Sequence, residues 1–204
     1  MSMREVNKSK RYKDGTVYDT INHGKITIVG QSDRAYKTNK GVAFFPYFYA
    51  AFSDKTVAVF AQTSIKQGSC KNKNTPFVSG IGYLGYGKYR ANEVTKGKSV
   101  NTKAYRTWNN MIQRCYDAVW QSRHPSYIGC TVAPRWWCFQ NFCADIETLD
   151  GYDIWKAEKV RMDLDKDIRI PGSRVYSKDT CKFVTPAENQ CEMLDRVLNR
   201  KQKN

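Results

Sequence analysis

The segment 162–168 alternates apolar residues with carboxylates, and this pattern restricts the fold more than any other stretch of the chain. Such alternation is typical of a half-buried strand, in which every second side chain faces the core. Asp163, Asp165 and Asp167 are then expected on one face, about 6–7 Å apart, because a strand rises about 3.3 Å per residue. Since like charges at that spacing repel, we expect Lys or Arg side chains, or a hard divalent cation, among them.

The residues after this acidic segment predict a strand–loop–strand–helix order. Residues 169–180 form a polar stretch with a Pro-Gly turn, and 181–184 have the composition of a second strand. Thr185 and Glu188 then have the spacing of a capping box, with Pro186 at the first helical position. A helix is therefore expected to begin here and to continue to about residue 199.

The charge of the chain indicates a polyanionic partner. The 204 residues carry a formal net charge of +15. Residues 1–100 hold 17 basic and 6 acidic side chains, a net charge of +11, whereas residues 101–204 hold 17 and 13, a net charge of +4. Lys and Arg gain affinity for nucleic acids by releasing the counterions that condense on phosphates. We therefore expect a nucleic acid, rather than a membrane, as the partner.

The sequence has none of the features that would predict a membrane or secreted protein. It contains no run of about 18 apolar residues that would predict a spanning helix, and its basic start has no apolar signal segment. Seven cysteines are an odd number, without the spacing of a small secreted disulfide framework. We expect reduced thiols in a cytoplasm.

The chain is expected to be an α+β protein in four parts. Residues 1–15 form a basic arm, 16–70 a small β-rich, barrel-like module, and 71–102 a linker rich in Gly and Lys. Residues 103–204 are expected to hold the helices and the acidic hairpin.

Two helices are predicted at the start of this last part. The segment 103–118 has an apolar stripe at three- and four-residue spacing, and 135–148 follows a Pro at position 134. Arg106 and Arg114 lie off the stripe and are candidates to contact phosphates. Lys88, Arg90 and Lys103 are further candidates in and beside the basic linker.

With these residues identified, Lys103–Gln190 resembles the phage and mobile-intron HNH homing-endonuclease family. The motifs match in order and spacing rather than singly. In this chain they are Tyr105-Arg106-Thr107-Trp108, Arg114-Cys115-Tyr116, Tyr127-Ile128-Gly129-Cys130-Thr131-Val132, Phe139-Gln140-Asn141-Phe142, Leu164-Asp165-Lys166-Asp167, Thr180-Cys181-Lys182-Phe183-Val184 and Asn189.

The resemblance implies a ββα-metal nuclease fold. It implies that Asp165 and Asn189 hold Mg²⁺ or Mn²⁺, with Asp163 and Asp167 as additional carboxylates. The family has a His directly after the acidic residue of the first strand, where it removes a proton from the attacking water. This chain has Lys166 there, and a Lys needs a strongly lowered pKa to act as a base near neutral pH.

Three candidates for the general base therefore stay open: Lys166 itself, His124 from the preceding loop, and Asp167 acting through a water. Structural Zn²⁺ is not expected, because Cys130, Cys138 and Cys143 include no C-x2-C pair.

The expected function is metal-dependent hydrolysis of phosphodiester bonds in double-stranded DNA, in the cytoplasm of a phage-infected bacterium. The alternative, favoured by the missing His, is a catalytically inactive phage regulatory protein that binds DNA or a host protein.

Overall fold

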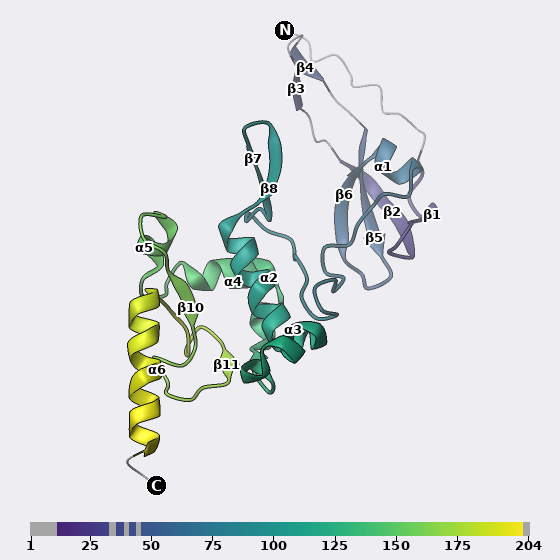
Figure 1. Cartoon of the computed structure of the whole chain (residues 1–204). Coiled ribbons are helices and arrows are strands. Elements are labelled where there is room, and N and C mark those ends of the chain that lie inside the picture. Colours follow the sequence, from purple (N-terminus) through teal and green to yellow (C-terminus); the bar gives the residue numbers. More distant parts are fainter. Residues whose placement is uncertain (1–11, 33–35, 39–40, 44–45, 202–204) are drawn as a thin grey trace. The chain divides into compact units, whose positions relative to one another are not determined.

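The computed structural model describes residues 12–32, 36–38, 41–43 and 46–201, and the chain divides into two compact units, Met1–Thr75 and Pro76–Asn204 (Figure 1). In the first unit, apolar residues two apart in sequence turn to one face of an antiparallel sheet. Ile26, Ile28, Phe48 and Phe52 are all buried there. The strands of this sheet lie in the order β1 (Val17–Asp19), β2 (Lys25–Ser32), β5 (Tyr47–Phe52) and β6 (Val57–Ala61).

The barrel-like form predicted for residues 16–70 is wrong for the described residues. The sheet has β1 and β6 at opposite edges, so it does not close on itself. The strands β3 (Tyr36–Thr38) and β4 (Gly41–Ala43) form a separate two-stranded sheet, and the short helix α1 (Gln62–Lys66) follows β6.

Most of the predicted basic arm, residues 1–11, lies outside the described residues. The described remainder packs onto the first unit. The ring of Tyr12 meets those of Tyr18 and Phe48 edge-on, with centroids 4.9 and 4.8 Å apart.

The second unit is built around α2 (Lys103–Tyr116), which confirms the first predicted helix. Thr102 caps it by accepting a hydrogen bond from the Tyr105 amide at 3.2 Å. The predicted apolar stripe is buried, and Trp108 donates its indole hydrogen to the Trp136 carbonyl at 2.8 Å. None of the helices in the described part of the chain has both the length and the apolarity that a membrane crossing needs.

The second predicted helix, 135–148, begins later than expected. A 3₁₀ turn (η2, Pro134–Trp137) comes first, then Cys138 is extended, and α4 (Phe139–Ile146) starts after it. The last carbonyl of η2 and the first amide of α4 both bond to the backbone of Tyr83, at 2.9 Å each. These two groups are therefore unavailable for a continuous helix.

The segment 71–102, predicted as a linker, is divided between the two units: residues 71–75 belong to the first and residues 76–102 to the second. From Pro76 onwards the chain belongs to the second unit, and Val78 is part of its core. A side-chain carbon at Gly85 would lie 2.5 Å from the sulfur of Cys138, so glycine permits this close approach. The segment ends in a hairpin of β7 (Asn92–Thr95) and β8 (Lys98–Asn101).

Short elements connect α2 to the C-terminal region. The 119–132 stretch, predicted as a loop with a terminal strand, contains a helix, a 3₁₀ turn and that strand. In order these elements are α3 (Ala118–Arg123), η1 (Pro125–Tyr127), β9 (Thr131–Val132) and, after α4, α5 (Tyr152–Lys156).

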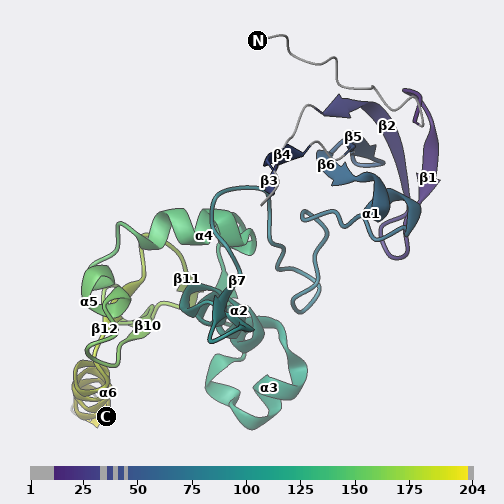
Figure 2. The ribbon, with the colours of Figure 1, turned by 90° about the horizontal axis from the view of Figure 1, so that it is seen from above.

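The predicted strand–loop–strand–helix order at the C-terminal end is confirmed. It consists of β10 (Asp163–Asp165), β12 (Lys182–Val184) and α6 (Pro186–Lys201). The connecting loop contains β11 (Val175–Tyr176), which pairs in parallel with β9. In Figure 1 and Figure 2 the β10–β12 hairpin lies at the N-terminal end of α6.

The capping box that starts α6 is also confirmed. The Thr185 amide and hydroxyl both donate to Oε2 of Glu188, at 2.7 and 3.0 Å, and the Glu188 amide donates to the Thr185 hydroxyl at 3.2 Å. The hydrogen bond from the Thr185 amide lowers the pKa of Glu188 below its usual value.

We expect Glu188→Ala to lower the free energy of unfolding by about 1 kcal/mol at neutral pH, because it removes this cap. A lowered pKa stabilises the fold above the ordinary Glu pKa, and this contribution is lost as the pH falls through the lowered value. Urea unfolding should therefore show the difference from the unchanged protein shrinking in acid. Glu188→Gln, which keeps an acceptor oxygen, should lose less, and a loss that did not depend on pH would contradict the role of the carboxylate.

Candidate active site

The β10–β12 hairpin places its carboxylates on the side away from the core. The strands are antiparallel, with Asp163 opposite Val184, Leu164 opposite Phe183 and Asp165 opposite Lys182. Leu164 and Phe183 are both buried, and side chains alternate along a strand. Asp163 and Asp165 therefore face away from the core together.

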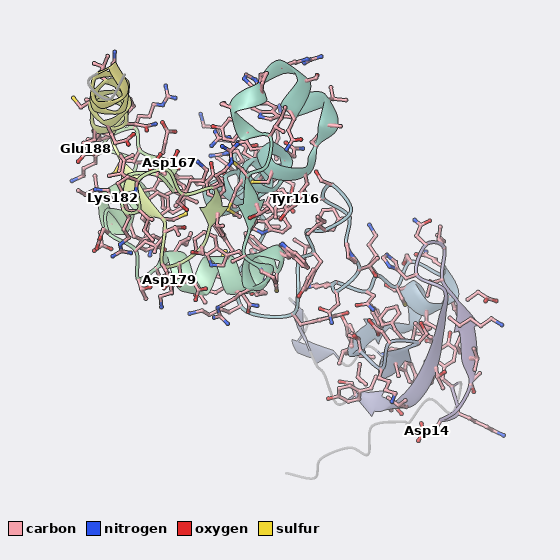
Figure 3. The ribbon with its side chains drawn as sticks, turned by 90° about the horizontal axis from the view of Figure 1, so that it is seen from below. Asp14, Tyr116, Asp167, Asp179, Lys182 and Glu188 are labelled. Carbon is pink, nitrogen blue, oxygen red and sulfur yellow. The ribbon has the colours of Figure 1, made fainter. Side chains whose placement is uncertain are left out.

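A groove of about 650 Å³ lies over this face and brings most of the predicted site together. Four predicted residues of the hairpin and its turn line it together with Asn189 from the first turns of α6 and Arg114 from the last turn of α2. The polar side chains in its wall are Arg114, Ser126, Tyr127, Arg161, Asp163, Asp165, Lys166, Asp167, Tyr176, Asn189 and Gln190. Figure 3 labels Asp167, Lys182 and Glu188 near one another, where the hairpin meets α6.

Asp165 closes a tight turn at the end of β10. Its Oδ1 accepts hydrogen bonds from the amides of Asp167 and Ile168, at 2.7 and 2.8 Å. This turn ends the strand at Asp165, so the prediction of one strand through residue 168 is wrong, and Asp167 belongs to the turn. The two amides fix the carboxylate of Asp165 and leave its Oδ2 for another ligand.

Lys166, which directly follows Asp165, is only 7% exposed. Its ammonium lies 2.8 Å from both carboxylate oxygens of Asp167 and 5.5 Å from the centre of the Tyr176 ring. The turn therefore holds Lys166 and Asp167 as a close ion pair. Asp163 has a looser cationic neighbour, Arg161, at 3.7 Å; Arg161 is well exposed, and Asp163 is partly exposed.

Arg114 is a half-buried cation of the groove. Burial alone would lower its pKa, but Tyr127, Tyr176 and Asp163 together raise the pKa above its usual value. Its guanidinium carbon lies 5.5 Å from the centre of the Tyr127 ring. Its Nε is buried, and it has no hydrogen-bond partner among the residues that the structure describes. A buried donor of this kind is suited to receive an oxyanion.

His124 is not brought to the groove. It is exposed, and its ring lies against Trp120 with centroids 4.6 Å apart. Ser126 and Tyr127, two and three residues further on, line the groove wall, whereas His124 does not.

The other predicted phosphate contacts lie away from Arg114. Lys103 and Arg106 are in the first turn of α2, and eight residues of helix, about 12 Å, separate Arg106 from Arg114. Lys103 donates to the Trp155 carbonyl, lies over the Trp155 ring and has Glu158 at 3.8 Å, so it is tied to α5.

The remaining basic candidates are closer to solvent. Arg106 donates to the Asn101 carbonyl at 2.9 Å and is exposed. Lys88 lies over the Tyr89 ring at 4.8 Å, and both Lys88 and Arg90 are exposed.

The donor set of the groove consists of oxygens. Within the described ranges, no group of three or more His, Cys, Asp or Glu side chains is arranged to hold a metal ion. Besides Asp167, which is paired with Lys166, the groove offers the carboxylates of Asp163 and Asp165 and the amide of Asn189. Carboxylate and amide oxygens fit a hard ion such as Mg²⁺ or Mn²⁺.

The cysteines of the second unit differ from these oxygen ligands in burial and protonation. Cys115, Cys130, Cys138, Cys143 and Cys181 are all buried. Burial raises the pKa of Cys115, Cys143 and Cys181 to about 12. These three side chains are therefore neutral thiols near pH 7, whereas metal binding needs thiolates.

Sequence reasoning gave no role to Arg161, Tyr127 or Tyr176, although all three line the groove. Arg161 could have been found, because it continues the alternation that leads through Asp163 to Asp165. Tyr127 and Tyr176 come from η1 and β11, and the pairing of β9 with β11 that brings these regions together has no local signal.

No protein-family model, curated protein or solved structure matches this chain.

Proposed function

We propose that this chain is a metal-dependent endonuclease of the HNH type, which hydrolyses phosphodiester bonds in double-stranded DNA in the cytoplasm of a phage-infected bacterium. One observation carries the proposal. The hairpin and α6 bring Asp163, Asp165 and Asn189 into the groove that also contains Arg114, a half-buried cation whose Nε has no hydrogen-bond partner among the described residues.

In the proposed reaction, different residues of the groove bind the metal ion and the phosphate. Asp165 and Asn189, with Asp163 beside them, are the residues that hold Mg²⁺ or Mn²⁺. The bound ion supplies stabilisation of the charge that builds up on the phosphate and the leaving oxygen. Arg114 and Arg161 bind and orient the phosphate, and the unpaired Nε of Arg114 gains a partner when an oxyanion enters.

Two of the three candidates for the general base, Lys166 and Asp167, lie in the turn after β10. His124 lies outside the groove, whereas Lys166 and Asp167 line it as an ion pair. We propose that this pair positions the attacking water and that the carboxylate of Asp167 accepts the proton of that water.

The test is a cleavage assay. The purified protein is expected to convert supercoiled plasmid into nicked or linear DNA in Mg²⁺ or Mn²⁺, and to leave it intact in EDTA. Genomic DNA from several hosts serves as a second substrate, because a selective enzyme can lack a site in one plasmid. Absence of metal-dependent cleavage on every substrate would overturn the proposal.

One observation favours a second function, namely DNA binding without cleavage. The ammonium of the buried Lys166 donates to both carboxylate oxygens of Asp167. The residue that stands where the HNH family has its His is therefore held in an ion pair. A protein that binds duplex DNA in EDTA but cleaves none in any metal would have this function.

A further inference from the structure

The β7–β8 hairpin is a two-stranded ribbon with a tight turn. Its strands pair from Asn92 opposite Asn101 to Thr95 opposite Lys98. Only Lys96 and Gly97 connect them, with φ of +50° and +75°, as in the two-residue turns that suit the twist of a hairpin. Figure 1 shows this ribbon extending from the region where α2 begins.

Both faces of the ribbon are open. All four residues of β7 and three of the four in β8 are exposed, and Val94 is 77% exposed. An isolated two-stranded hairpin is only marginally stable in water, and such ribbons are usually covered on one face. A partner that surrounds the ribbon on both sides would account for this exposure. The major groove of B-form DNA admits a two-stranded ribbon in this way.

The base of the ribbon is anchored and basic. Thr102, the cap of α2, donates to the Arg90 carbonyl at 3.1 Å, and Arg106 donates to the Asn101 carbonyl at 2.9 Å. The segment 88–106 contains six basic residues and one acidic residue, Glu93. The ribbon is therefore attached at its base to the start of α2, and the positive charge of this segment favours contact with phosphates.

The two lysines and the amide and methyl groups lie at different places along the ribbon. Lys96 and Lys98 lie at its tip. Residues opposite each other share a face, so Val94 and Ser99 lie on the same side as the Asn92–Asn101 pair. The Asn92 amide nitrogen donates to the Asn101 amide oxygen at 2.7 Å, which leaves further donors and acceptors on both side chains. Amides and methyl groups are the side-chain groups that recognise adenine and thymine in the major groove.

We infer that the β7–β8 ribbon enters the major groove of duplex DNA, with Lys96 and Lys98 on the phosphates and the Asn92–Val94 face toward the base edges. This inference takes double-stranded DNA from the proposed function but does not depend on cleavage.

The test is binding of the full chain to a fluorescent duplex of mixed sequence in EDTA, at several salt concentrations. Lys96→Ala with Lys98→Ala removes two phosphate contacts, so the slope of log K against log salt should become shallower by about 1.8. Affinity near about 0.1 M salt should fall by about tenfold or more. Gly97→Val, which keeps the charge but strains the left-handed turn, should also weaken binding.

Arg123→Ala with Lys178→Ala is the matched control. It removes the same charge from exposed positions outside the ribbon, and it should change the slope by less than the ribbon variant does. Equal effects of the two pairs, or a ribbon variant that binds like the unchanged protein, would overturn the inference. Because binding is measured in EDTA, a protein that binds through the ribbon but never cleaves refutes the nuclease proposal alone. A protein that binds no duplex DNA refutes both.

Discussion

The Asp165→Asn variant is expected to bind duplex DNA as well as the unchanged protein while its metal-dependent cleavage falls by about 100-fold or more. Asn keeps the Oδ1 that accepts the amides of Asp167 and Ile168, so the turn after β10 persists. What it loses is the negative charge that would hold the metal ion in the proposed function. Changes to groups that merely support a metal ligand already lower activity by about 10–100-fold, so the loss of a ligand should exceed this.

The measurement is the rate of plasmid nicking in Mg²⁺ and in Mn²⁺, with binding followed separately in EDTA. Asp150→Asn is the control, because Asp150 is an exposed carboxylate of the same unit, 3.2 Å from Arg169 and outside the groove. It should cleave at the rate of the unchanged protein. An Asp165→Asn variant that cleaves normally would remove Asp165 from the metal site.

The parts of the fold that sequence predicted correctly are those with local signals. The stripe of α2 repeats at helical spacing, and Thr185 and Glu188 lie three residues apart in a capping box, so both helices could be predicted without knowledge of the rest. The hairpin between β10 and β12 also follows from the alternation of its first strand. These same elements carry the carboxylates and Asn189, which explains why the acidic half of the groove was predictable.

The parts that sequence missed depend on distant residues. Cys138 is extended because Tyr83, 55 positions earlier, takes the neighbouring backbone groups, and no pattern near Cys138 indicates this. The glycine-rich segment was predicted as a linker because its composition is typical of one, whereas Gly85 allows close packing against Cys138. The strand through residue 168 was predicted from alternation alone, and the side chain of Asp165 ends it earlier.

A substitution behind the hairpin should separate the stability of the site from its chemistry. Gly151 has a φ of +81°, and a side-chain carbon there would lie 2.5 Å from the Phe183 carbonyl oxygen and 3.0 Å from Cε of Met162. Phe183 is also the residue of β12 whose amide donates to the Asp150 carbonyl at 2.9 Å. An added methyl group must therefore push β12 away from the chain that supports it.

Gly151→Ala is expected to lower the free energy of unfolding by about 2–5 kcal/mol, from left-handed strain of about 1–2 kcal/mol and overpacking of about 1–3 kcal/mol. Gly172→Ala isolates the first contribution, because Gly172 has a φ of +78° with no atom within 4 Å of an added side-chain carbon, and it should lose only about 1–2 kcal/mol. Urea unfolding of both variants gives the comparison, and equal losses would mean that β12 does not pack on Gly151. Because β12 pairs with the strand that carries Asp163 and Asp165, Gly151→Ala should lose cleavage together with stability. Asp165→Asn, in contrast, should lose cleavage while the fold persists.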